Sequence, residues 1–133
     1  MRLIPISVAL FTLIILVVLS STALGIREEY DPVVISVGVP LSGQWDAEGS
    51  AILRAVELAT EEINNDGGLL GRRLLLAIND TEAAPLVAAE LARSWSEEGT
   101  ILAHLGGFAS GPTIAAQRYF DSEGLLQLSP TVG

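Results

Sequence analysis

The segment best suited to hold a ligand is residues 106–113, which read Gly-Gly-Phe-Ala-Ser-Gly-Pro-Thr. Their spacing approaches the phosphate-binding pattern of a glycine, four residues, a second glycine, a lysine and a serine or threonine, but Pro112 replaces the lysine. A nucleotide phosphate is therefore disfavoured, whereas free backbone N–H groups at the start of a helix still suit a carboxylate. Ser110 adds a hydroxyl, and its alternative role is to cap the helix that follows.

Other chemistry-bearing residues give little support to catalysis. The sequence contains no cysteine, and it has no serine in a G-x-S-x-G elbow. The single histidine, His104, lies in an apolar segment and is interpreted as a core residue that hydrogen-bonds locally rather than as a catalytic base. We therefore expect a protein that is not an enzyme.

The acidic residues indicate a solvated surface rather than a metal site, so we expect neither a metal nor a cofactor. Two groups lack the spacing and the closing glutamate of a calcium loop: Glu61, Glu62 and Asp66, and Asp80 and Glu82. From residue 26 onward, sixteen acidic residues face six arginines, which leaves a formal charge of −10. This balance disfavours nucleic acid as a partner.

Four apolar runs alternate with amphipathic ones, which predicts the order β-α-β-α-β-α-β. Strands are expected at residues 33–39, 72–78, 101–105 and 125–128. Helices are expected from residue 50 until Asn-Asp-Gly-Gly at 65–68, from 85 to the glycine at 99, and from Pro112 through Phe120, where Gly124 ends the helix. This alternation predicts an α/β fold with a parallel sheet and helices on both faces.

Open α/β sheets bind ligands outside the carboxyl ends of their strands, where the strand order reverses. With the order 2-1-3-4, the turn at residues 40–49 and the glycine turn at 106–111 face one crevice, and residues 129–133 form a third loop at this edge. Trp45, in the first loop, either stacks on a ligand or fills a hydrophobic gap. Phe108 and Ala109 are further candidate ligand contacts.

Residues 1–25 are typical of an export segment. Arg2 precedes an uncharged stretch, and small residues at 21 and 23 suit a signal peptidase. Residues 3–19 also approach the length of a membrane anchor. In both cases we expect the rest of the chain in the periplasm or outside the cell, with a linker at 26–32 and one domain at 33–133. That domain is expected to be truncated, because no helix follows its fourth strand.

Several motifs occur in an order that resembles the type I periplasmic binding proteins of the leucine/isoleucine/valine-binding family. They are Val-Gly-Val-Pro-Leu-Ser-Gly at 37–43, Glu-Glu-Ile-Asn at 61–64 with Gly-Gly-Leu-Leu-Gly-Arg at 67–72, Asn79-Asp80 followed by Pro85, the glycine turn with Ser110, and Gly124 followed by Leu-Ser-Pro at 128–130. The resemblance covers residues 33–133.

This resemblance implies a periplasmic solute receptor with two lobes, a cleft between them and an ABC-type permease as partner. It also implies that Ser110, Thr131 and Gly133 hold the carboxylate of an amino acid, with Gly133 standing where family members often have a threonine. The alternative is a ligand-sensing receptor of the same fold, held at the membrane by residues 3–19.

Overall fold

The computed structural model describes residues 10, 11, 13–17 and 30–130. Its strands are β1 (Val33–Val39), β2 (Leu74–Asp80), β3 (Ile101–Gly106) and β4 (Leu126–Leu128). They form a parallel sheet in the order β2-β1-β3-β4, which confirms the predicted α/β class and strand order.

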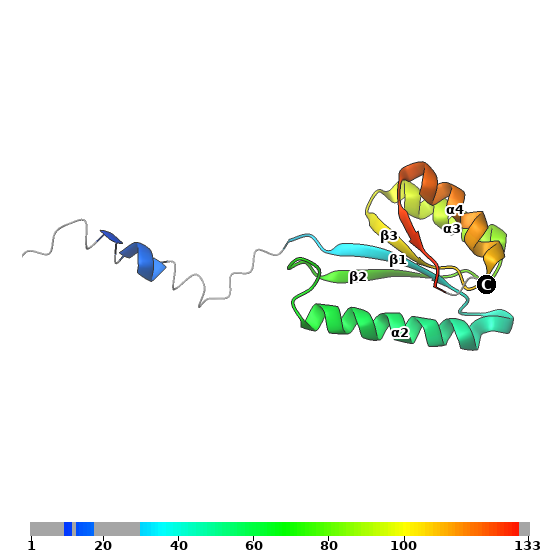
Figure 1. The fold of residues 1–133 in the computed structure, drawn as a ribbon, viewed down its shortest axis with the longest axis horizontal. Helices are drawn as coiled ribbons and strands as arrows, with labels where there is room; N and C mark the ends of the chain where they lie inside the picture. Colours follow the sequence, from blue (N-terminus) through cyan, green and yellow to red (C-terminus); the bar gives the residue numbers. More distant parts are fainter. Residues whose placement is uncertain (1–9, 12, 18–29, 131–133) are drawn as a thin grey trace, which may run out of the picture.

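The helices cover both faces of this sheet, as predicted. They are α2 (Asp46–Asn65), preceded by the short 3-10 helix η1 (Gly43–Trp45), α3 (Pro85–Glu98) and α4 (Ser110–Glu123). Helix α2 lies on one face, and α3 and α4 pack together on the other (Figure 1). Residues 10, 11 and 13–17 are helical and exposed. Within the described ranges, no helix has the length and apolarity needed to cross a membrane.

The main core lies between the sheet and the α3–α4 pair. It is built from side chains of both helices and of β3: Ala92, Trp95, Ile101, Ala116 and Phe120. Helices α3 and α4 end at Gly99 and Gly124, as the sequence predicted, and both glycines adopt a left-handed backbone. The two largest core rings, Trp95 and Phe120, stack with centroids 6.4 Å apart.

The opposite face of the sheet is only partly covered. A groove of about 370 Å³ runs between α2 and the sheet, lined by apolar side chains that include those of Ile35 and Leu105. Gln127 turns toward α4, since its amide donates to the Thr113 carbonyl oxygen. Its neighbours Leu126 and Leu128 therefore point to the α2 face, where they are 59% and 53% exposed.

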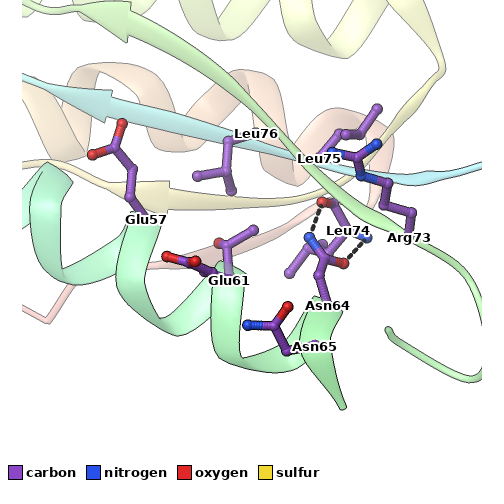
Figure 2. Close-up of a pocket in the computed structure, with 9 residues that line it drawn as sticks. Glu57, Glu61, Asn64, Asn65, Arg73, Leu74, Leu75 and Leu76 are labelled. Atoms are coloured by element: carbon purple, nitrogen blue, oxygen red, sulfur yellow. Dashed lines mark hydrogen bonds between the residues drawn. The ribbon is translucent and has the colours of Figure 1, made fainter. Parts of the chain in front are cut away.

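The C-terminal part of α2 is tied to β2 by one side chain. Asn64 accepts a hydrogen bond from the Leu74 N–H at 2.7 Å and donates to the Leu74 carbonyl oxygen at 2.9 Å. Figure 2 shows this pair beside a second hollow of about 370 Å³, which Glu57 and Glu61 also line. An asparagine amide thus pairs with the strand backbone as a neighbouring strand would.

Several predicted boundaries are wrong. Helix α2 begins at Asp46 rather than at residue 50, and the carboxylates of Asp46 and Glu48 favour this start because they face the positive end of the helix dipole. Strand β2 begins at Leu74 rather than at residue 72, because Arg72 forms a bridge with Leu69 in a tight turn. Small differences also occur at other ends: β3 extends to residue 106, β4 begins at 126, and α4 covers 110–123.

Candidate functional site

The carboxyl ends of β1 and β3 lie side by side, at the point where the strand order reverses. Gly38 pairs with Gly106, and the Gly107 N–H donates to the Gly38 carbonyl oxygen at 3.0 Å. The loops that follow these strands meet as predicted: the rings of Trp45 and Phe108 lie with centroids 5.1 Å apart and planes tilted by 44°. Two loops from distant parts of the chain therefore form one surface.

The glycine turn is fastened to the end of β4. Gly107 has a φ of +88°, and a Cβ at this position would overlap the Thr113 hydroxyl oxygen. The Ser129 hydroxyl donates to the Gly107 carbonyl oxygen at 2.9 Å, and the Thr113 hydroxyl donates to that of Ala109 at 2.8 Å. Sequence reasoning assigned no role to Thr113, whose bond to the residue four positions earlier forms because α4 begins at Ser110 rather than at Pro112.

Ser110 occupies the first position of α4 rather than its cap. The N-cap residue is Ala109, which is extended and makes no side-chain capping bond. The interpretation of Ser110 as the N-cap is therefore wrong, because the helix begins two residues earlier than Pro112 suggested. The Ser110 hydroxyl lies in the first helical turn, where the helix dipole favours an anion.

Asp80, at the end of β2, fastens the loop after β1. Its Oδ1 accepts hydrogen bonds from the Leu41 N–H at 2.7 Å and from the Glu82 N–H at 2.8 Å. Burial raises the pKa of this carboxyl, but hydrogen bonds from the hydroxyl and N–H of Ser42 and from the Leu41 and Glu82 N–H groups outweigh that effect and leave the pKa below its ordinary value. From the sequence, Asp80 was part of a motif that carries the family resemblance and was otherwise placed on a solvated acidic face, with no role in holding a loop.

His104 is a core residue, as interpreted from the sequence. Its ring is buried and stacks on Phe120 with centroids 4.6 Å apart. The His104 Nδ1 and the Ser36 hydroxyl oxygen lie 2.8 Å apart and form a hydrogen bond. Burial lowers the pKa of His104 from about 6.5 to about 4, so the ring is neutral at pH 7. Among the described residues, every buried side-chain nitrogen or oxygen has a hydrogen-bond partner.

The structure brings four of the six candidate residues together at the carboxyl edge. They are Trp45, Phe108, Ala109 and Ser110, from η1, the glycine turn and α4. Thr131 and Gly133 lie outside the described residues, as do most of residues 1–25 and the first part of the predicted linker. In the part of the chain that the structure describes, no group of three or more histidine or acidic side chains is arranged to hold a metal ion.

Comparison with known proteins decides the family. The family model described as periplasmic binding protein matches residues 32–133. This chain belongs to that family. A Leu/Ile/Val-binding protein homolog from Brucella abortus is 30% identical over 98 residues, which is 74% of this chain and 26% of the relative.

Solved structures of the family share this fold. The branched-chain amino acid binding protein LivJ of Streptococcus pneumoniae, in complex with isoleucine, superposes with a TM-score of 0.73 at 27% identity. An ABC transporter substrate-binding protein of Desulfitobacterium hafniense, in complex with leucine, gives a TM-score of 0.64 at 33% identity. Each match covers 76% of this chain and 29% of the other chain. The chain thus spans between a quarter and a third of the length of these relatives.

Proposed function

We propose that this chain is the N-terminal part of the extracytoplasmic solute-binding component of an ABC-type importer, and that the solute is an amino acid. The observation that carries the proposal is the meeting of the loops after β1 and β3, where the Trp45–Phe108 pair lies beside the start of α4. In an open α/β sheet, this is where ligands bind. The relatives whose structures contain isoleucine and leucine support an amino acid as ligand.

The ligand carboxylate is held at the first turn of α4. Backbone N–H groups and the helix dipole favour an anion there, and the Ser110 hydroxyl donates one further hydrogen bond. Thr131 and Gly133 complete this end of the site from the loop after β4. The rings of Trp45 and Phe108, together with Ala109, contact the apolar part of the ligand. These contacts support reversible binding, and no covalent step is part of the proposal.

The domain at residues 33–133 is proposed to be the truncated first lobe of a two-lobed receptor. The low share of each relative that the chain covers supports this, as does the partly covered α2 face of the sheet. A second lobe closes the cleft, and the loaded receptor delivers its amino acid to a membrane permease. Residues 1–25 direct export to the periplasm, and mass spectrometry of the exported product should find a chain that begins near Leu24 or Ile26.

Calorimetric titration of the longer, two-lobed protein with leucine, isoleucine and valine tests this function. We expect saturable binding of at least one of them. The matched control is leucinol, which keeps the leucine side chain and amino group but has no carboxylate, and which should bind much more weakly. Equal binding of leucine and leucinol would contradict the carboxylate site. No binding of any amino acid would contradict the function.

A further inference from the structure

We propose that Asp80 is a positioning residue for the ligand-binding surface, because its carboxylate holds the loop after β1 so that Trp45 lies against Phe108. The effect of Asp80 on ligand affinity rests on the proposed function. Its effect on the position of Trp45 does not depend on that function and can be measured without any ligand.

The hydrogen bonds of Asp80 join two parts of the chain that are distant in sequence. The contact with the Glu82 N–H, two residues on, is a local turn that many aspartates make. The contact with the Leu41 N–H at 2.7 Å is different, because it links the end of β2 to the loop that leaves β1. Ser42, the next residue, also lies beside this carboxylate and helps to lower its pKa.

Trp45 follows these anchored residues directly. Ser42 precedes η1, which covers Gly43–Trp45, and makes no side-chain capping bond to that helix. Its hydroxyl instead helps to lower the pKa of the Asp80 carboxyl. Between this anchor and Trp45 lie two residues, of which Gly43 has a φ of +78°, a left-handed conformation that glycine adopts without strain. The indole ring then reaches Phe108 across the edge of β1 and β3.

The backbone of Trp45 is also held by α2, which begins at the next residue and packs on Pro40, but its indole ring is only partly buried. It is 40% exposed, whereas the second tryptophan, Trp95, is only 4% exposed in the core. A carboxylate is also well suited to this role, because it accepts several hydrogen bonds at once and its charge strengthens each of them. Loss of the carboxylate should therefore release the loop and leave the core intact.

Acrylamide quenching of tryptophan fluorescence in the ligand-free chain tests the proposal. The quencher reaches Trp45 and spares Trp95, since only the former is exposed. In Asp80→Ala we expect quenching of the exposed tryptophan to rise by up to about 2.5-fold, because the indole moves from 40% exposure toward full exposure. Glu82→Gln is the matched control: it changes an exposed carboxylate in the same turn and should leave quenching unchanged.

Two further variants keep the outcome decisive. If the circular dichroism spectrum shows that Asp80→Ala is unfolded, Asp80→Asn is used as the test of the proposal. In this variant an NH₂ group replaces one of the two acceptor oxygens, while the side chain keeps its size. We expect a smaller rise in quenching for this variant, still above that of Glu82→Gln. Ser42→Ala should also raise quenching, since it removes a hydroxyl that interacts with the Asp80 carboxylate and helps to lower its pKa. Unchanged quenching in a folded Asp80 variant would overturn the proposal.

Amino-acid titration of the longer protein separates this proposal from the function on which it rests. If the parent protein binds leucine, Asp80→Ala should weaken binding by about tenfold, whereas Glu82→Gln should not. Unchanged affinity in Asp80→Ala would overturn the role in binding. If the parent protein binds no amino acid, the proposed function fails, while the quenching result still decides whether Asp80 positions Trp45.

Discussion

The indole of Trp45 and the phenyl ring of Phe108 lie 5.1 Å apart, although one follows β1 and the other follows β3. This contact exists because β1 and β3 are neighbours in the sheet, so their carboxyl ends and the loops that leave them meet. The site is therefore a product of the strand order. It also leaves Trp45 with two possible roles, as a ligand contact or as a filler of a hydrophobic gap.

Substitution of Trp45 distinguishes these two roles. We expect Trp45→Ala to weaken leucine binding to the longer protein by about tenfold, because a stacking surface is lost. The free energy of unfolding should fall by less than about 1 kcal/mol, because the ring is already 40% exposed. Trp45→Phe, which keeps an aromatic face, should retain most of the affinity. Calorimetry and urea denaturation measure both quantities, and a large loss of stability at unchanged affinity would support the gap-filling role.

Substitution of Ser110 tests the carboxylate site. We expect both Ser110→Ala and Ser110→Gly to weaken amino-acid binding by about ten- to a hundredfold, the cost of about 1.5–3 kcal/mol for losing a hydrogen bond to a charged group. Because Ala109 holds the N-cap position, neither variant should show the loss of stability that follows removal of a cap. Calorimetric titration of the longer protein measures the effect. If the Ser110→Gly variant binds as tightly as the parent protein, the assignment of Ser110 to the ligand site is contradicted.

Burial of His104 predicts a pH dependence of stability. Its pKa is about 4 in the folded chain and about 6.5 when unfolded, so the unfolded state takes up the proton first as the pH falls. The free energy of unfolding should therefore decrease between pH 6.5 and about 4 by up to roughly 3 kcal/mol and level off below that range. Urea denaturation across this range measures it. In His104→Asn this decrease in the free energy of unfolding should be absent. An equal dependence on pH in the parent and in the variant would contradict the prediction.

Replacing Gly49 with alanine should destabilise the protein, although alanine usually stabilises a helix relative to glycine. A Cβ at this position would overlap the Pro40 carbonyl oxygen, because the first turn of α2 packs directly on the end of β1. We expect Gly49→Ala to lower the free energy of unfolding by about 1–3 kcal/mol, although alanine normally gains about 1 kcal/mol over glycine in a helix. Ser50→Ala, one residue further on, is the control and should be neutral or slightly stabilising. A stabilised Gly49→Ala variant would contradict this packing.

The exposed leucines of β4 should make this chain self-associate. Leu126 and Leu128 form an apolar surface on the α2 face of the sheet, in β4, which is the outermost strand among the described residues. We expect light scattering to show association, and the double substitution Leu126→Gln and Leu128→Gln to reduce it. Leu86→Gln removes an 80% exposed leucine from α3 and serves as the control. A chain that is monomeric and stable, or equal effects of both changes, would contradict this role of β4.

Local sequence patterns were sufficient to predict the order and type of the elements. Residues 33–39 form a strand with the predicted bounds because an apolar run of β-branched residues is too short for a buried helix. Gly99 and Gly124 end their helices as predicted, because a left-handed residue there depends only on local backbone freedom. The glycine turn after β3 was found for the same local reason. The starts of α2 and α4 were missed by a few residues, since helix ends also respond to tertiary packing.

The side chains that meet at the carboxyl edge could be identified only once the strands were paired. The bond between Asp80 and the Leu41 N–H and the bond between Ser129 and the Gly107 carbonyl each join segments that follow different strands. Such contacts depend on strand order and on parallel register, in which Val39 lies opposite Asp80. The strand order was predicted, but the register leaves no local pattern in the sequence, because a side chain's own neighbours do not specify its partner across the sheet. The anchor of Trp45 therefore became visible only when the strands were paired.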